Sequence, residues 1–433
     1  MKLFLSLIIL MLSISSHANQ RLVIDTWGDE LRLWQQKIIP AFQRHHPEIE
    51  LVIKQMDSWN YVPTQNQRFA NQEAGDLVMC KPFDPSLNWF KAGYLEDITD
   101  LAGMENFPSF AQAAWQTDSG ASSFCLPLGS VMHGFFYNKR AFAELGLVEP
   151  ESEAEFFNIL ERIKSHGKYL PLAFGSKDAW AVSEVALQNI GPNYWQGEDG
   201  RFRLLEGKEA VDSPAYKQAL ASIQAWGSYM GEGHEARSYG DAWALFNSGK
   251  AVIAPGGSWE IANLSADLEL AVFKPPVPEG QQQCYVSDHT DKGIAINSAS
   301  PNKQAAYKLL QWMTSAEFAQ LFTESEPGFF SLSNHFFELS NPLARTMQGW
   351  RFKCDVTIRN FSQLLSRGEP NFQAQMSEVS QAVIQQRLSP ELAVAQLQQS
   401  LNQWYLPQQQ LFEQHKLEQQ HCTHPLVINK LEE

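Results

Sequence analysis

Cysteine, basic residues and long apolar runs are all scarce in this 433-residue chain. Its cysteines show no CxxC or metal-type spacing, which argues against zinc binding and disulfide redox chemistry. Asp and Glu outnumber Lys and Arg by 48 to 33, and the net charge of −15 argues against nucleic acid and anionic membranes as partners. Beyond the N-terminus no run of about eighteen apolar residues occurs, so we expect no membrane-spanning helix in the mature chain. These scarcities favour a globular protein that handles neutral or cationic ligands.

Motifs of common hydrolases and of nucleotide binding are also missing. The chain contains no GxSxG, HExxH or P-loop pattern, and its eleven histidines are scattered. We therefore expect no catalytic residue, no metal and no cofactor. A secreted carbohydrate-active enzyme remains an alternative, because Asp84 and Asp178 would suit glycoside hydrolysis if they faced each other across a cleft.

The first eighteen residues are typical of a secretory signal peptide. Lys2 supplies the positive charge, and residues 3–12 form an apolar run too short to span a bilayer. Ser16-His17-Ala18 is a small-x-small cleavage site, and no cysteine follows for lipid attachment. We therefore expect a periplasmic protein, in a compartment where disulfides can form.

What the chain does contain is an alternation of short apolar runs and amphipathic segments. Apolar residues make up 44% of the sequence, and the length favours two or three domains. Residues 21–25, 49–54 and 76–80 are predicted strands, and a helical apolar spacing after the first strand ends at Pro47. Strand and helix in alternation predict an α/β fold with a doubly wound, parallel sheet.

Ligands bind beyond the carboxyl ends of the strands in such sheets. The loops that follow the three predicted strands alternate aromatic and polar side chains. Exposed tryptophans in loops are a sign of binding surfaces. The candidate ligand residues of this part of the chain are Trp27, Trp59, Lys81 and Asp84.

The middle of the chain predicts a second sheet. Residues 122–128 form a predicted strand, Gly129-Ser130 a flexible connector, and residues 133–139 a strand of the new sheet. Ser152 and Glu155 have the spacing of a capping box at a helix start. Two further predicted strands are each followed by a polar and aromatic loop, which adds the candidates Asp178, Trp180, Gly257, Ser258 and Trp259.

The helix expected to open at Ser258 would present free backbone N–H groups, which together with the hydroxyl could donate hydrogen bonds to a ligand. Residues 293–296 are a predicted strand and 300–313 a predicted helix, and residues 327–333 form another glycine-bearing connector. The rest is mainly helical. The glutamine-rich end past Pro407 is expected to be a marginal or frayed helix.

Three segments occur in a suggestive order: "FFYNKRAFAELGL…PESEAEFFNILERI", "DAWALFNSGKAVIAPGGSW" and "GIAINSASPNKQAAYKLLQWMTSAEFAQ". Together they resemble the family 1 extracellular solute-binding proteins, the maltose-binding-protein-like proteins that serve carbohydrate ABC importers. The resemblance covers residues 21–406. It implies the two-lobed, type II periplasmic-binding-protein fold, with a doubly wound sheet in each lobe and three hinge crossings near residues 128–132, 288–292 and 328–331.

The resemblance also implies the domain boundaries. The N-terminal lobe would contain residues 21–128 and 292–328, and the C-terminal lobe residues 129–291 and 329–406, which leaves a tail at 407–433. Because Cys284 and Cys354 fall in the same predicted lobe, they are the pair we expect to form a disulfide. Ser130, Asp288, His289 and Phe329 lie at the crossings and join the candidate ligand residues.

The implied function is capture of a mono- or oligosaccharide in the cleft between the lobes. Indole rings stack on sugar C–H faces, and polar side chains bond to the hydroxyls. In the resembled family the loop after the Gly-Ser-Trp motif commonly reaches the ligand, which favours Gly257, Ser258 and Trp259. The expected partners are the permease subunits of an ABC transporter, and the protein is expected to be a monomer. Delivery to a sensor or receptor, or another small polar or cationic solute as ligand, remain alternatives.

Overall fold

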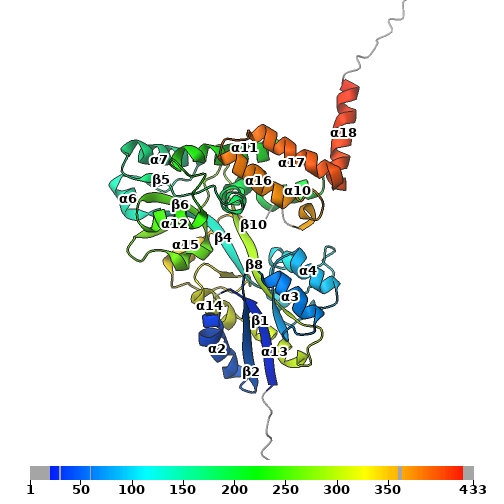
Figure 1. Ribbon diagram of the computed structural model, residues 1–433. Coiled ribbons are helices and arrows are strands. Elements are labelled where there is room, and N and C mark those ends of the chain that lie inside the picture. The colour runs from blue at the N-terminus through cyan, green and yellow to red at the C-terminus, as the bar shows by residue number, and fades with distance from the viewer. Residues whose placement is uncertain (1–19, 29–30, 59, 359–362, 423–433) are drawn as a thin grey trace, which may run out of the picture.

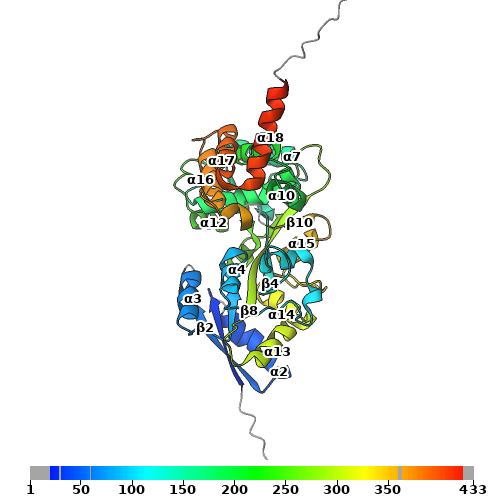
Figure 2. The same ribbon diagram turned by 90° about the vertical axis from the view of Figure 1, so that its right-hand side faces the viewer.

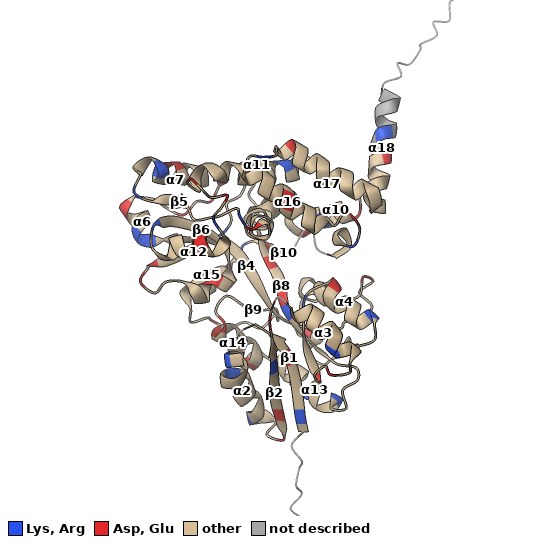
Figure 3. Ribbon diagram, in the orientation of Figure 1, with Lys and Arg blue, Asp and Glu red and all other residues tan. Residues whose placement is uncertain are grey.

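The computed structural model describes residues 20–28, 31–58, 60–358 and 363–422 (Figure 1). Figures 1 and 2 show two bodies, one above the other, with two long strands running between them. We call the body that holds the N-terminal strands the first lobe and the other body the second lobe. Figure 3 shows that Lys and Arg lie interspersed with Asp and Glu over both lobes.

The first lobe is built on the parallel sheet that the sequence predicts. β1 (Gln20–Trp27) pairs in parallel with β2 (Ile49–Met56) and with β3 (Leu77–Cys80). Alternate β1 residues such as Leu22 and Ile24 are fully buried, because the helices cover the sheet. These helical segments are α1 (Leu31–Leu33), the π-helical η1 (Trp34–Ile38), α2 (Ile39–His45), α3 (Tyr61–Ala70), α4 (Asp84–Lys91), η2 (Met104–Asn106), α5 (Ser109–Gln112), η3 (Ala113–Trp115), α13 (Lys303–Met313) and α14 (Ala316–Ser325).

The second lobe surrounds a smaller group of strands. β6 (Ala251–Gly257) pairs in parallel with β5 (Leu170–Leu172), and β7 (Leu270–Phe273) joins from another part of the chain. The expected capping box of Ser152 and Glu155 starts α7. The helices of this lobe are α6 (Lys139–Glu144), α7 (Glu153–His166), α8 (Ala179–Ala181), the π-helical η4 (Val182–Leu187), α9 (Gln188–Trp195), α10 (Gly197–Leu205), α11 (Pro214–Trp226), η5 (Gly227–Tyr229), α12 (Tyr239–Asn247), η6 (Ser258–Asn263), α15 (Pro342–Trp350), η7 (Gln363–Ser366), α16 (Phe372–Ile384) and α17 (Pro390–Trp404).

Two long strands join the lobes. β4 (Leu126–Asn138) and β8 (Tyr285–Ile296) are antiparallel neighbours, so that hydrogen bonding continues from one lobe into the other in the order β2-β1-β3-β8-β4-β6-β5. The short strands β9 (Phe330–Ser331) and β10 (Asp355–Thr357) pair with β4 and β8 respectively. The third passage of the chain between the lobes therefore lies directly beside the first two.

The expectation of a flexible connector at Gly129-Ser130 is wrong. Both residues are buried within β4, a strand of 13 residues whose pairing with β8 shifts register at these two positions. A Cβ at Gly129 would lie 2.7 Å from Cε1 of Phe322, so glycine is required here for close packing against α14. The predicted strands at 122–128 and 133–139 are thus two ends of a single element.

Each lobe has its own hydrophobic core. The core of the first lobe combines residues 22–128 with residues 294–332 and Ile358. The second lobe is packed around two clusters formed from residues 132–401, among which Phe135, Trp226 and Trp243 are prominent. Each lobe therefore packs around its own core, and the three crossings are the covalent connection between the two lobes.

Two disulfides form, and the expected Cys284–Cys354 bond is one of them. The sequence did not indicate the second, which joins Cys80 at the end of β3 to Cys125 just before β4. Cys125 directly precedes β4 and Cys284 directly precedes β8. Each disulfide therefore fixes the start of a crossing strand to the lobe in which that strand begins.

The expected marginal helix at the C-terminal end is α18 (Leu406–Cys422), which projects from the second lobe (Figure 1). Its first turn is anchored by Gln408, whose Nε2 donates to the carbonyls of Leu204 (2.7 Å) and Glu209 (2.9 Å). Within the described ranges, none of the helices combines the length and apolar character needed to cross a membrane.

Candidate functional site

The carboxyl ends of the parallel strands of both lobes point towards the crossing strands. Cys80, the last residue of β3, lies opposite Gly293 of β8, and Gly257, the last residue of β6, lies opposite His133 of β4. The pairing of Met132 with Asp288 puts His133 level with Ser287, six residues from Gly293 along β8. At ~3.3 Å per residue the two edges face each other across roughly 20 Å of crossing strand. The loops singled out from the sequence therefore border the space between the lobes.

The second lobe contributes a cluster of aromatic rings around a buried carboxylate. The ring centroids of Trp180 and Tyr239 are 5.0 Å apart, and Trp180 is 43% exposed. The Tyr239 hydroxyl donates to Oε1 of Glu260 (2.8 Å), and Nε1 of Trp259 donates to the same oxygen (2.9 Å). Two predicted residues, Trp180 and Trp259, thus belong to one surface, which we call the aromatic platform: Trp180, Tyr239, Trp259 and Glu260.

Neutral donors and burial set the electrostatics of this platform. Burial raises the pKa of Glu260 above its usual value, although the hydrogen bonds from Tyr239 and Trp259 oppose the shift. The pKa of Tyr239 is raised well above its usual value, first by burial and then by the charge of Glu260. The Glu260 carboxyl is therefore the acceptor of this cluster, and it receives hydrogen bonds from two aromatic side chains.

Asp178 fixes the backbone of Tyr239, which belongs to the platform. Its Oδ2 accepts from the backbone N–H of Tyr239 (2.7 Å), at the position where α12 begins. Ser238 caps α12 in a capping box with Asp241, which fixes the direction of the helix start. Asp178 therefore orients Tyr239 at the start of α12.

Gly257 and Ser258 hold Trp259 in place. A Cβ at Gly257 would lie 1.9 Å from the Trp259 ring, so glycine leaves the space that the indole fills. The buried Ser258 hydroxyl accepts from the backbone N–H of Met132 (2.9 Å) and donates to the carbonyl of Gly328. The helix expected to open at Ser258 is present as the short 3-10 helix η6, and the serine bonds to two crossings of the chain.

Strand alternation divides the predicted residues of the crossings between two faces. His289 lies on the same face as His133, and the two rings are 5.0 Å apart, while His133 also contacts Trp259 at 5.4 Å. Ser130 and Asp288 lie on the opposite face, because side chains of successive strand residues alternate. The structure therefore brings His289 to the aromatic platform and takes Ser130 and Asp288 away from it.

Arg351 occupies that opposite face. Its Nε donates to Oδ2 of Asp288 (2.6 Å), its Nη2 to the hydroxyl of Ser130 (2.8 Å) and its Nη1 to the carbonyl of Ser331 (3.0 Å). One guanidinium thus ties β8, β4 and β9 together. Ser130 and Asp288 serve this junction of the three crossings, a role that no local sequence signal indicates, since Arg351 is 63 residues from Asp288.

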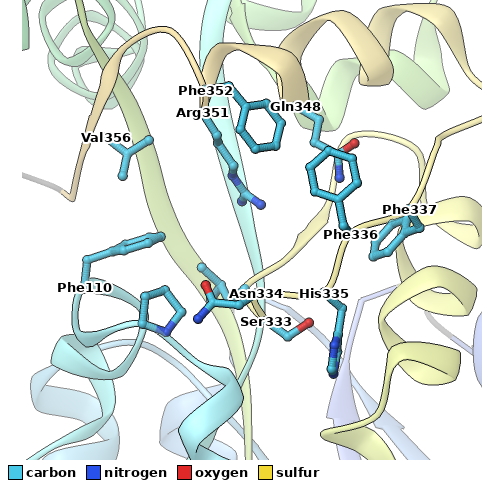
Figure 4. A pocket seen from close by; sticks show the side chains of 12 residues that line it. Phe110, Ser333, Asn334, His335, Phe336, Phe337, Gln348, Arg351, Phe352 and Val356 are labelled. Atoms are coloured by element: carbon cyan, nitrogen blue, oxygen red, sulfur yellow. The ribbon is translucent and has the colours of Figure 1, made fainter.

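A pocket of about 250 Å³ lies beside Arg351 on this face. Figure 4 shows Phe110 and Phe336 on opposite sides of the pocket, with Arg351 between them. Phe336 and Phe352 are 81% and 67% exposed, and their rings are 5.2 Å apart.

The first lobe presents a different surface to the space between the lobes. Nζ of Lys81 lies 3.9 Å from the centroid of the Trp27 ring, whose other neighbour is Tyr61 at 4.9 Å. Trp27 is buried, so Lys81 covers the indole face that a ligand would otherwise use. Asp84 opens α4 and bonds to Arg367 of the second lobe, and Trp59 lies outside the described residues.

Phe329 borders a cavity formed by both lobes. The cavity has a volume of about 400 Å³ and is lined by Arg32, Gln36 and Lys37 of the first lobe, by Ala262 of η6, and by Phe329 at the third crossing. Nζ of Lys292 lies 3.8 Å from the Phe329 ring centroid and 2.8 Å from Oε2 of Glu326. This volume falls within the range of small-molecule sites.

The family model described as "Bacterial extracellular solute-binding protein" matches residues 27–320, more than half of the chain. The chain belongs to this family. Two related solute-binding proteins are the "Multiple sugar-binding protein" of Streptococcus mutans, 24% identical over 297 residues (66% of this chain and 69% of the relative), and the "Mannitol-binding protein" of Pseudomonas aeruginosa, 23% identical over 351 residues (73% and 74%).

Solved structures of solute-binding proteins share the fold. The apo form of RafE from Streptococcus pneumoniae superposes with a TM-score of 0.73 at 18% identity, covering 89% of this chain and 98% of RafE. The solute receptor AcbH superposes with a TM-score of 0.72 at 18% identity, covering 88% and 99%. The type II two-lobed architecture is therefore that of binding proteins rather than enzymes, and membership of an extracellular family makes this an exported protein.

Several residues of this solute-binding protein's interlobe region had no visible signal in the sequence. Tyr239 and Glu260 complete the aromatic platform, and Arg351 and Arg367 bond across segments that are far apart in the chain. The SxxD capping pattern of Ser238 and Asp241 predicts a helix start just before Tyr239, and was the one clue available.

Proposed function

We propose that this protein is the periplasmic substrate-binding component of a carbohydrate ABC importer. It holds a mono- or oligosaccharide between its lobes and presents the closed form to the permease subunits as a monomer. The observation that carries the proposal is the aromatic platform, in which exposed Trp180 lies beside Tyr239 while Tyr239 and Trp259 both donate to Glu260. Related proteins named for sugars and mannitol, and the structure of RafE in complex with raffinose, support a saccharide as ligand.

The chemistry of the platform suits a sugar. A pyranose has apolar C–H faces that stack on indole and phenol rings, and equatorial hydroxyls that donate to carboxylates. Hydrogen bonds to a charged acceptor contribute about 1.5–3 kcal/mol each, so Glu260 and a stacked ring together account for micromolar affinity after the costs of association. We include Lys81, His289 and Phe329, which were also expected from the sequence, among the proposed ligand residues, whereas Trp27 is buried beneath Lys81.

Closure follows from contacts with both lobes. A ligand shifts the open–closed equilibrium only if it binds the closed form more tightly. Moving the ratio from 1:99 to 99:1 takes about 5.5 kcal/mol of differential affinity. A saccharide that touches the platform on one side and the first lobe on the other makes contacts that exist only when the lobes approach.

A thermal-shift screen tests the proposal. Wild-type protein is heated with raffinose, galactose, mannitol and chitin oligosaccharides, and ligand at 100 times its Kd stabilises the protein by about 2.7 kcal/mol. Trp180→Ala should weaken binding of the saccharide that stabilises the wild type by about tenfold, because a stacked ring is lost. Phe336→Ala, an exposed aromatic on the opposite face, is the matched control and should bind as the wild type does.

One other solute class has a specific observation in its favour. A buried carboxylate bonded to two aromatic side chains, with Trp180 beside one of them, also suits an organic cation, because ring faces and a carboxylate attract positive charge. Spermidine and choline therefore belong in the same screen. Stabilisation by either of them and by no saccharide would replace the proposed ligand class while leaving the binding-protein function in place.

A further inference from the structure

Arg367 joins the two lobes on the side of the interlobe space where α4 lies. Its Nε is 3.0 Å from both carboxylate oxygens of Asp84, and its Nη2 is 2.7 Å from Oδ1. Its Nη1 and Nη2 each donate to a different oxygen of Asp118, both at 2.8 Å. One guanidinium of the second lobe therefore binds two carboxylates of the first lobe, in the forked geometry for which arginine is suited.

The arginine is held firmly by its own lobe. Leu365, two residues before it, is fully buried in the second-lobe core. Gly368, the next residue, packs so closely on Trp404 that an added Cβ would lie 1.9 Å from the indole. Asn371 bonds back to the carbonyl of Ser366 (2.6 Å). The guanidinium thus extends from a fixed backbone rather than from a loose loop.

The two carboxylates are equally fixed by the first lobe. Asp84 is the first residue of α4, where the helix N-terminus favours a negative charge. Asp118 lies in a turn closed by hydrogen bonds from Thr117 N to Ser122 O (2.9 Å) and from Gly120 N to Thr117 O (2.8 Å). The hydrogen bonds from Arg367 are the largest cause of a lowered pKa at Asp118, and the charge of Lys91 adds to the effect.

A second contact supports the first. Gln363, which starts η7, donates from its Nε2 to the carbonyl of Ala113 in the first lobe (3.3 Å). In Figure 1, α4 lies on one side of β8 and α14 on the other. The contacts of Arg367 therefore close the α4 side of the interlobe space, while the cavity beside Phe329 opens on the α14 side.

We propose that Arg367, Asp84 and Asp118 form an interlobe clasp that holds the lobes together on the α4 side before any solute binds. The clasp makes the ligand-free protein more closed than its three crossings alone would. It also takes Asp84 out of solute binding, since both of its oxygens accept from the arginine. The clasp goes beyond the proposed function and holds whatever the solute is.

The exposure of the clasp determines how it responds to salt. The side chains of Arg367 and Asp84 are 28% and 29% exposed, and that of Asp118 is 45% exposed. Ion pairs so open to solvent are screened by salt, with a Debye length of about 10 Å at 0.1 M and about 3 Å at 1 M. The net charge of −15 also makes the two lobes repel each other. Salt screens this repulsion as well, but screening it would compact the protein. Expansion at high salt would therefore come from the clasp.

Small-angle scattering of the ligand-free full chain tests the clasp. Arg367→Ala should shift the closed-to-open ratio about tenfold towards open and increase the radius of gyration at low salt. Raising NaCl to 1 M should expand the wild type towards the value of the variant and leave the variant unexpanded. Arg367→Lys, which keeps the charge but loses the fork, should fall between the two.

Arg140→Ala is the matched control, because Arg140 and Glu269 form an exposed ion pair (3.0 Å) inside the second lobe alone. It should leave the radius of gyration and its salt response unchanged. Equal radii for the wild type and Arg367→Ala at low salt, with both proteins shown to be folded by circular dichroism, would overturn the proposal. Because no solute is added, this result is independent of whether a saccharide binds.

Discussion

At the scale of single residues, Glu260 is the most consequential side chain of the interlobe region. It accepts from two neutral donors on one oxygen, and it lies at the base of rings that the solvent reaches. Burial costs the charged form free energy, which is why its pKa rises. A ligand hydroxyl that donates to this carboxylate would recover part of that cost.

Ligand affinity should therefore depend on pH through Glu260. Its pKa lies above the usual 4.5, so lowering the pH protonates it earlier than an ordinary glutamate and weakens a hydrogen bond that needs the charged acceptor. Isothermal titration between roughly pH 4 and 8 should show affinity falling on the acid side, and Glu260→Gln should bind more weakly at neutral pH without that fall. A wild-type affinity that stays flat over this range would remove Glu260 from the ligand contacts.

The raised pKa of Glu260 also makes the free energy of unfolding depend on pH. Because the folded pKa is raised, the group binds a proton more readily in the folded state than in the unfolded state. Its contribution to the unfolding free energy is therefore greatest below the ordinary pKa and declines as the pH rises through the raised pKa. Glu260→Gln removes this decline. Near neutral pH the substitution should therefore raise the free energy of unfolding while it weakens ligand binding.

At the scale of elements, the third crossing and η6 depend on one glycine. Gly328 has φ +102°, and a Cβ there would lie 1.9 Å from the carbonyl oxygen of Ser258. Its own carbonyl accepts from the Ser258 hydroxyl. The turn at Gly328 therefore sets the position of the segment that carries Trp259.

Gly328→Ala should lower the free energy of unfolding by about 2 kcal/mol or more, since it combines a steric clash with an unfavourable φ. Urea unfolding measures this change. Gly349→Ala is the matched control: Gly349 lies inside α15, nothing comes within 4 Å of its added Cβ, and alanine should stabilise the helix by about 0.5–1 kcal/mol. Equal stability of the two variants would contradict the tight fit inferred at Gly328.

The apolar pattern of the sequence correctly predicts those strands and helices whose formation depends on residues close together in the chain. The expected strand at 49–54 is β2, and the expected helix at 300–313 contains α13, because each buries one face of a regular pattern. The continuity of β4 through Gly129 had no local cause. It depends on pairing with β8, more than 150 residues away, and on the ring of Phe322. The Cys284–Cys354 bond was predicted because both residues fall in one predicted lobe. Cys80 and Cys125 also share a predicted lobe, but that bond was not predicted. It joins the end of β3 to the residue just before β4, and both strands pair with β8.

The candidate site residues also fall into two groups, which differ in whether a distant segment of the chain binds them. Trp180 and Trp259 were proposed because they follow predicted strands, beyond whose carboxyl ends ligands bind in α/β folds. Asp84, Ser130 and Asp288 satisfied the same rule or lay at a crossing, yet each bonds to an arginine from a distant segment. Which polar residues are taken up by such partners is a property of tertiary structure, and no spacing in the sequence shows it.

At the scale of the whole molecule, two rigid lobes meet at a junction that is narrow and well bonded. Arg351 ties the three crossings together on one face, and the aromatic platform lies on the other. Relative motion of the lobes must therefore occur by small changes spread along β4 and β8 rather than at a loose linker.

Binding of the saccharide identified by the screen should compact the protein. Contacts to both lobes favour the closed form, so the radius of gyration should fall on saturation at high salt, where the clasp is screened. Scattering at 1 M NaCl with and without the saccharide makes the comparison. Trp180→Ala at the same concentration should compact less, because its sites are less fully occupied. An unchanged radius at saturation would show that this protein binds its solute without closing.

The insertion of β8 between β3 and β4 has a consequence for how the chain is made. The first-lobe core needs Ile294 and Phe322, so the N-terminal quarter of the protein cannot finish folding until some two hundred further residues have left the ribosome. Through that interval the edge of β3 that later pairs with β8 has no partner, and the first lobe stays incompletely packed. The chain order thus delays completion of the N-terminal lobe until most of this exported protein has been made.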